Sequence, residues 1–65
     1  MAMKPYQQRV VDEKFELDDK LRKLMAFISG GSFGDVHPEE QERLVRQYRH
    51  MEDYSGVLAE RILEF

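Results

Sequence analysis

The chain contains no cysteine and, in 65 residues, only two prolines and four glycines. The absence of cysteine excludes disulfides and thiolate metal sites, and it favours a reducing compartment such as the cytoplasm. No apolar run approaches the roughly 20 residues of a membrane span, and the N-terminus lacks the hydrophobic core of a signal peptide. We therefore expect a soluble, unexported protein without disulfide support.

Positive charge is also in short supply, with 10 Lys and Arg against 13 Asp and Glu and a formal net charge of −3. A chain with this balance does not attract a nucleic-acid polymer or an anionic membrane by its overall field. An RNA-binding helical dimer is accordingly a disfavoured interpretation. Any anion that the protein binds must occupy a local pocket.

Catalytic and metal-binding motifs are missing as well. The sequence has no cysteine nucleophile, no GxSxG motif and no HExxH pair, and His37 and His50 fall in different predicted elements. Ser32 lies in GGSFG, but this stretch lacks the lysine of a phosphate-binding P-loop and a preceding strand, so a plain turn explains it. We predict a protein that is not an enzyme and that has no metal site and no cofactor.

The first half of the chain predicts an amphipathic helix over about residues 5–28. Pro5 suits the first helical position, and no glycine or proline interrupts the segment afterwards. Phe15 falls to one side of the apolar stripe, which creates a second apolar edge that one partner helix cannot cover. The stripe itself recurs at spacings of seven, four, three and four and consists of Val10, Leu17, Leu21, Leu24 and Ile28.

Residues 29–37, SGGSFGDVH, break this periodicity and predict the hairpin turn. Gly30 or Gly31 is expected to end the helix in the left-handed conformation that glycine tolerates. Asp35 or His37 is expected to cap the following helix, in which Pro38 occupies the first turn.

The second half predicts a helix over about residues 38–65. Glu39 and Glu40 place negative charge in its first turn, where the helix dipole favours it. Gly56 costs about 1 kcal/mol relative to alanine inside a helix, which suggests close approach by another backbone or a ligand. A heptad stripe alternates steps of four and three to the end of the chain and comprises Leu44, Tyr48, Met51, Ser55, Leu58, Ile62 and Phe65.

Together these elements predict one all-α domain over residues 1–65, a two-helix antiparallel hairpin. A chain of this size buries only about 60% of its unfolded surface, while ordering costs roughly 1.5 kcal/mol per residue. Without disulfides or metal, association with further copies is the remaining source of apolar burial. We therefore expect the hairpin to assemble into a helical homo-oligomer.

Most charged residues have a simple explanation as acid-first pairs four residues apart on a solvated helix face, such as Asp18 with Arg22 and Asp19 with Lys23. Two clusters stand out from this pattern. Lys4 and Arg9 flank Tyr6 at the start of the first helix, where free backbone N–H groups favour an anion, although Tyr6 also suits a core-covering role.

The second cluster places Arg46, Arg49 and His50 near Tyr48 and Tyr54 on the second helix. Pairing of Arg49 with Asp53, and packing of Tyr48 in the apolar stripe, are the favoured explanation of these residues. Both clusters are therefore candidate binding sites with an ordinary structural alternative.

Three stretches carry a family resemblance that covers nearly the whole chain. They are QQRVVDEK near the start, the KLxxFI pattern at Lys23–Ile28, and the MxDYSxxLxxRI pattern at Met51–Ile62. With them, the chain resembles a family of small phage proteins that includes the anti-CBASS cyclic-nucleotide sponges. The resemblance implies a compact helical hexamer in the cytoplasm of an infected bacterium, which captures cyclic oligonucleotide messengers of bacterial immunity without cleaving them.

The resemblance also implies site residues. Family members hold cyclic dinucleotides in pockets between protomers, which implies that Tyr6 stacks on a base and that Arg9, Lys20 and Lys23 contact phosphates from two facing protomers. Some members hold cyclic trinucleotides at separate sites, for which Arg46, Arg49 and Tyr54 are the candidates. The alternative from a different class is a small oligomeric protein that binds or scaffolds a host or phage protein through an apolar helix face carrying Phe15, or through Phe33.

Overall fold

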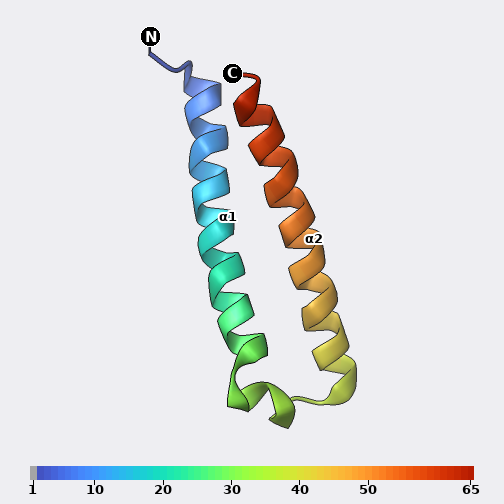
Figure 1. Ribbon diagram of the computed structural model, residues 1–65. Helices are drawn as coiled ribbons and strands as arrows, with labels where there is room; N and C mark the ends of the chain where they lie inside the picture. The colour runs from blue at the N-terminus through green and yellow to red at the C-terminus, as the bar shows by residue number, and fades with distance from the viewer. Residues whose placement is uncertain (1) are drawn as a thin grey trace.

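The computed structural model describes residues 2–65 as two long helices joined by a short helical turn. Helix α1 spans Pro5–Ser29, the 3-10 helix η1 spans Gly31–Asp35, and α2 spans Pro38–Leu63. The two long helices run side by side in opposite directions, so that both chain ends lie at one end of the hairpin and η1 at the other (Figure 1). The predicted all-α antiparallel hairpin is confirmed. It forms a rod of 50 × 15 × 14 Å.

Both long helices begin with a proline. Near each helix start, a side chain accepts a hydrogen bond from a free backbone N–H group. At α1, the backbone N–H of Lys4 donates to Oε1 of Gln7 at 2.9 Å. At α2, His37 is the cap, because its Nδ1 accepts a hydrogen bond from the backbone N–H of Glu39 at 3.3 Å. His37 thus takes the capping role for which Asp35 was the other candidate.

The turn differs from the prediction that a left-handed glycine ends α1. No glycine in residues 2–65 has a positive φ, and Gly30, the C-cap, has φ −86°. Its backbone N–H donates to the carbonyl of Phe27 at 3.1 Å. A Cβ at Gly30 would lie 3.1 Å from the carbonyl oxygen of Ala26, so the close approach of α1 explains a glycine here better than handedness does.

Gln41, in the first part of α2, holds the turn closed. Its Nε2 donates to the backbone carbonyls of Phe33 at 3.0 Å and Val36 at 2.8 Å. The ring of Phe33 meets that of Phe27 edge to face, with centroids 6.2 Å apart. Side chains from both long helices therefore fix η1 in place.

The apolar core is a single narrow seam between the helices. Within residues 2–65, Val10 and Leu58 are the only buried hydrophobic residues, and the other stripe residues are half-buried apart from Ser55, which is buried, and Phe65, which is exposed. Phe15 is 79% exposed, in agreement with its predicted position outside the stripe. Large apolar side chains remain exposed along the rod: Met3, Tyr6, Phe15, Met25, Phe27, Tyr54, Val57, Leu63 and Phe65.

A polar bridge interrupts the seam near its middle. The Lys14 Nζ donates to Ser55 Oγ at 2.7 Å and pairs with Asp18 Oδ2 at 2.9 Å, while the Ser55 hydroxyl donates to Asp18 Oδ1 at 2.5 Å. Ser55 is buried although it occupies the apolar stripe of α2. The bridge therefore joins α1 to α2 at one register.

The surface ion pairs follow the predicted pattern only in part. The Asp19–Lys23 pair forms at 2.9 Å, as predicted. Arg22, however, pairs with Asp19 three residues earlier, while Asp18 pairs with Lys14 and accepts a hydrogen bond from Ser55. Within residues 2–65, neither long helix includes a stretch apolar enough to span a bilayer.

Gly56 has open space around it within the chain. No heavy atom lies within 4 Å of a Cβ built at this position, apart from neighbours in its own helix. Packing of α1 on α2 therefore does not explain this mid-helix glycine. Close approach by another chain or a ligand stays a prediction.

Candidate ligand-binding sites

Tyr6, in the first turn of α1, is the aromatic residue of the first candidate site. Its side chain is 48% exposed at the open end of the hairpin, where the two chain ends meet (Figure 1). The ring contacts that of Phe65 at a centroid distance of 6.1 Å and an interplanar angle of 75°. Tyr6 therefore has a packed side and a side that is free for a ligand.

A hollow of about 350 Å³ lies next to this aromatic pair. Its lining residues are Ala2, Met3, Lys4, Gln7 and Phe65, so Phe65 borders the hollow whereas Tyr6 does not. Arg9 does not line the hollow, and it forms no salt bridge with any residue of the described chain. The cluster predicted around Tyr6 is thus only partly assembled in one protomer, with Lys4 at the hollow and Arg9 one turn further along.

Lys20 and Lys23 are far from Tyr6 within the same protomer. Fourteen residues separate Tyr6 from Lys20, which places them about 21 Å apart along the axis of α1. Lys23 is also engaged by Asp19. One hairpin therefore does not bring the predicted dinucleotide-binding residues into a single pocket.

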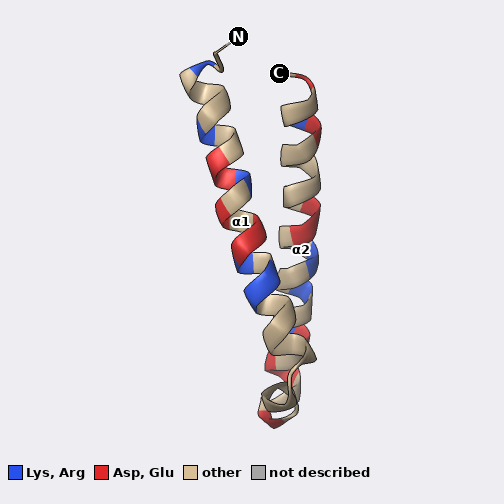
Figure 2. Cartoon of the chain, turned by 60° about the vertical axis from the view of Figure 1, so that its left-hand side comes forward, with Lys and Arg blue, Asp and Glu red and all other residues tan. Residues whose placement is uncertain are grey.

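These residues nevertheless share one side of α1. At 3.6 residues per turn, Tyr6, Arg9, Lys20 and Lys23 fall within about 100° of arc. Acidic residues lie between them, as the alternating blue and red segments of α1 show (Figure 2). This side therefore carries an aromatic ring and a cation near the start of α1, and two lysines further along, rather than a continuous basic stripe.

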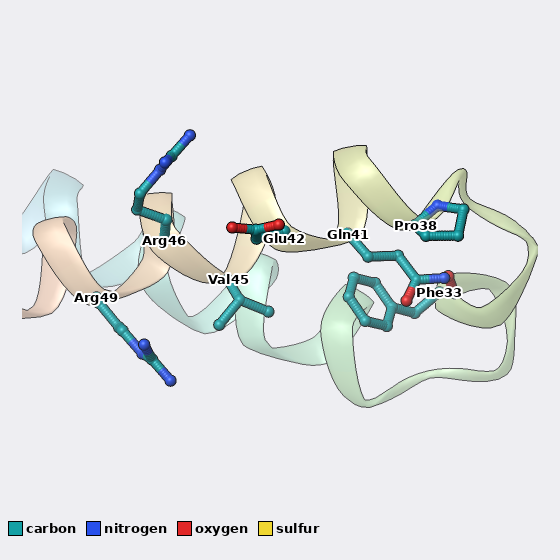
Figure 3. Close-up of a pocket in the computed structure, with 7 residues that line it drawn as sticks. All are labelled: Phe33, Pro38, Gln41, Glu42, Val45, Arg46 and Arg49. Atoms are coloured by element: carbon teal, nitrogen blue, oxygen red, sulfur yellow. The ribbon is translucent and has the colours of Figure 1, made fainter.

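The second candidate site is an open groove of about 430 Å³ near the turn. Arg46 and Arg49 both line it, and their side chains extend to opposite sides of α2 (Figure 3). Neither arginine forms a salt bridge within residues 2–65. Tyr54 does not line the groove. The other lining residues are Phe33, Pro38, Gln41, Glu42 and Val45.

Phe33 gives this groove an aromatic wall that the sequence analysis did not connect with Arg46 and Arg49. Its ring lies below Gln41 and Pro38 in the close-up view (Figure 3). In the sequence, the only sign of this wall is the position of Phe33 as the single aromatic residue of a glycine-rich turn. The groove therefore combines an aromatic surface with two cations, while the carboxylate of Glu42 limits its net positive charge.

Tyr48, which the sequence places near the second cluster, has a structural role. Tyr48 is half-buried in the seam, and its hydroxyl donates to Glu52 at 3.3 Å. Partial desolvation and the neighbouring Glu52 carboxylate raise the pKa of Tyr48. No three His, Asp or Glu side chains of residues 2–65 gather in a metal-binding arrangement.

These features define a small helical-hairpin protein with candidate ligand surfaces near both ends of the rod. Residues 4–64 match the model of the Sequestin family. The chain is also 36% identical over 63 residues to the uncharacterised 7.5 kDa protein of the denB-rIIB intergenic region of Enterobacteria phage T4, covering 97% of this chain and 98% of that protein. The chain therefore belongs to the Sequestin family. No solved structure matches it.

Proposed function

We propose that the protein is a phage anti-immune factor that binds cyclic oligonucleotide second messengers and sequesters them without cleaving them. Its ligands would be cyclic dinucleotides such as cyclic GMP-AMP, together with cyclic trinucleotides, in the cytoplasm of an infected bacterium. Membership of the Sequestin family and the similarity to a phage T4 protein support a sequestering role. The observation that carries the choice of ligand is the exposed aromatic ring of Tyr6 on the same side of α1 as Arg9, Lys20 and Lys23.

The chemistry of these groups matches a cyclic dinucleotide. Such a ligand has two bases and two phosphates related by a rough two-fold axis, so a symmetric interface offers each half the same groups. Stacking of one base on an aromatic side chain contributes about 1–3 kcal/mol. Two copies of Tyr6, with charge-assisted phosphate contacts from Arg9, would supply nanomolar affinity if the site is formed before binding.

This site requires more than one copy of the chain. The roughly 21 Å between Tyr6 and Lys20 exceeds the reach of both side chains around one small ligand. Two facing copies of α1 in opposite directions would bring Tyr6 and Arg9 of one protomer close to Lys20 and Lys23 of its partner. The narrow core and the exposed apolar side chains support a homo-oligomer, and the family resemblance favours a hexamer.

For cyclic trinucleotides we propose the groove near the turn. Arg46 and Arg49 line it and have no competing salt bridge in the described chain. Phe33 adds a surface on which a base can stack. Tyr54 lies outside the groove, so any contact from Tyr54 would have to come from another protomer.

Calorimetry with cyclic GMP-AMP and a panel of cyclic di- and trinucleotides tests the proposal. We expect tight binding by the wild-type protein, about 10-fold to 100-fold weaker dinucleotide binding by Tyr6→Ala, and unchanged binding by the surface control Glu60→Ala. Heat-denaturing the complex should release intact ligand, as measured by chromatography. Absence of heat and of a thermal shift across the panel would contradict the proposal.

A protein-binding hairpin is the second candidate function, and the 79% exposure of Phe15 favours it. In that case Phe15→Ser would abolish capture of a host or phage partner, while Tyr6→Ala would leave function intact. The opposite pattern, loss with Tyr6→Ala and retention with Phe15→Ser at a protein concentration at which sedimentation shows the variant still assembled, would support the cyclic-nucleotide function.

A further inference from the structure

The last residue of the chain, Phe65, lies against Tyr6 although 59 positions separate the two in the sequence. The α2 terminus is ordered at this point, because the backbone N–H groups of Glu64 and Phe65 donate to the carbonyls of Arg61 and Ile62, each at 3.1 Å. This closing turn directs Phe65 back across the seam. The contact therefore connects the end of α2 with the first turn of α1.

We propose that Phe65 is a positioning residue for the ligand, which holds the Tyr6 ring in the orientation that stacks on a base. This inference rests on the proposed cyclic-nucleotide function. It adds the C-terminal end of α2 to a site whose other expected contacts all come from α1.

The geometry of the two rings supports this role. Their planes meet at 75°, so one ring directs its edge toward the other. Whichever ring supplies the edge, at least one face of Tyr6 stays uncovered, in accordance with its 48% exposure.

The effect on affinity follows from side-chain ordering. An exposed tyrosine in the first turn of a helix samples more than one rotamer, and a ligand that stacks on it must select one. Restraining the ring before binding removes a cost that corresponds to about 2-fold to 10-fold in affinity for each side chain. A ligand that engages Tyr6 from two protomers gains this factor twice, up to about 100-fold.

Phe65 also lines the hollow beside Tyr6 together with Met3, Lys4 and Gln7. A role limited to closing the end of the seam would need only an apolar side chain. Leucine would meet that need, whereas the edge contact with Tyr6 requires an aromatic ring. The two roles therefore separate experimentally.

Calorimetry with cyclic GMP-AMP on Phe65→Leu, Phe65→Tyr and Leu63→Ala tests the inference. We expect 2-fold to 100-fold weaker binding by Phe65→Leu, and wild-type affinity for Phe65→Tyr, which keeps the aromatic edge. Leu63→Ala removes a neighbouring apolar side chain that is 84% exposed, and it should bind as the wild type does. Sedimentation of each variant at the same concentration controls for assembly.

A second measurement requires no ligand. The Tyr6 ring resonances, assigned by comparison with Tyr6→Phe, should move in Phe65→Leu, because the ring current of Phe65 is lost, and stay in place in Leu63→Ala. Wild-type affinity in Phe65→Leu would overturn the positioning role alone. Absence of binding by the wild-type protein would overturn the proposed function and, with it, any role of Phe65 in that function.

Discussion

Ser55 has an unusual position for a polar residue, because it is buried in the apolar stripe of α2. The amine of Lys14 and the carboxylate of Asp18 satisfy its hydroxyl as acceptor and donor. Buried polar groups that are satisfied in only one alignment specify register, since any slip leaves them unpaired. Ser55 thus defines how α1 and α2 align, whereas the apolar seam supplies most of the attraction between them.

Replacing Ser55 with alanine should destabilise the hairpin. The variant loses one hydrogen bond from Lys14 and one to Asp18, and both partners remain partly exposed, so water compensates for part of the loss. We expect the free energy of unfolding to fall by about 1–2 kcal/mol. Urea unfolding followed by circular dichroism measures the change, and Ser32→Ala in the exposed turn is the matched control. Equal stability of Ser55→Ala and wild type would contradict a structural role for the bridge.

The same bridge makes stability depend on pH. The hydrogen bond from Ser55 and the neighbouring Lys14 lower the pKa of Asp18 below its ordinary value of 3.8. Because the native pKa is depressed, the stabilisation is fully present above the unfolded-state pKa and is lost as pH falls through the native pKa. We expect Asp18→Asn to be less stable than wild type at neutral pH, with a difference that shrinks below about pH 4.

Asp19 provides the control for this titration. Lys23, with Arg22, also lowers the pKa of Asp19, but the side chains of these two cations are 75% and 73% exposed, whereas that of Lys14 is 27% exposed. Thermal unfolding from about pH 2 to 7, in low salt and in roughly 0.5 M NaCl, separates the contribution of Asp18 from that of Asp19, since salt screens exposed ion pairs most strongly. The loss of thermal stability caused by Asp19→Asn should largely disappear in salt, while the loss caused by Asp18→Asn should persist. A pH-independent difference for Asp18→Asn would contradict the assignment.

At the scale of elements, apolar periodicity predicted the two helices and their pairing, because burial of one stripe against another needs only a repeat near 3.6 residues. The turn was not predictable in the same way. The side-chain amide of Gln41 determines its form by reaching back to two carbonyls, and that contact depends on where α2 begins in space. The contact between Ser55 and Asp18 was equally out of reach of local patterns, since the two residues lie 37 positions apart in the sequence.

The candidate sites show the same limit. Sequence reasoning identified the exposed tyrosine and the cations, because residue type and helix position are local properties. It did not connect Tyr6 with Phe65, or Phe33 with Arg46, because these neighbours meet only through the alignment of α1 and α2 and the path of η1. The heptad pattern places Phe65 in the apolar stripe and gives no sign of its contact with Tyr6.

Removing the Gln41 clamp should loosen the turn without unfolding the helices. Gln41→Ala loses two hydrogen bonds to backbone carbonyls, which corresponds to about 1–2 kcal/mol of unfolding free energy. Hydrogen exchange at the Val36 amide, which donates to Phe33, should accelerate. Gln47→Ala is the control, because within residues 2–65 the Gln47 side chain donates a hydrogen bond only to the sulfur of Met51, at 3.7 Å. Unchanged exchange at Val36 would show that the clamp is dispensable.

At the scale of the whole molecule, Gly56 tests whether another chain packs closely against α2. In an isolated hairpin, Gly56→Ala should add about 1 kcal/mol of helix stability, since nothing in the chain obstructs a Cβ. If another copy lies against this position, overpacking costs about 1–3 kcal/mol and outweighs the gain. We expect the second case, in which the Gly56→Ala variant keeps its helical content but sediments as a smaller oligomer than the wild type. A more stable variant with intact assembly would place Gly56 outside any interface.

The dependence of stability on concentration follows from the exposed apolar surface. With Val10 and Leu58 as the only fully buried hydrophobic residues of the described chain, one hairpin removes little apolar area from water, so other copies must supply the remainder. Unfolding coupled to dissociation should then lower the melting temperature by roughly 3–9 °C for each tenfold dilution.

Phe15→Ser should lower the melting temperature further at every concentration, because each chain loses about 2 kcal/mol of burial against other copies. The adjacent exposed control Glu16→Ser should not lower it. A melting temperature that stays constant on dilution to micromolar protein would mean that the lone hairpin is stable, and a binding pocket shared between protomers would then lose its physical basis.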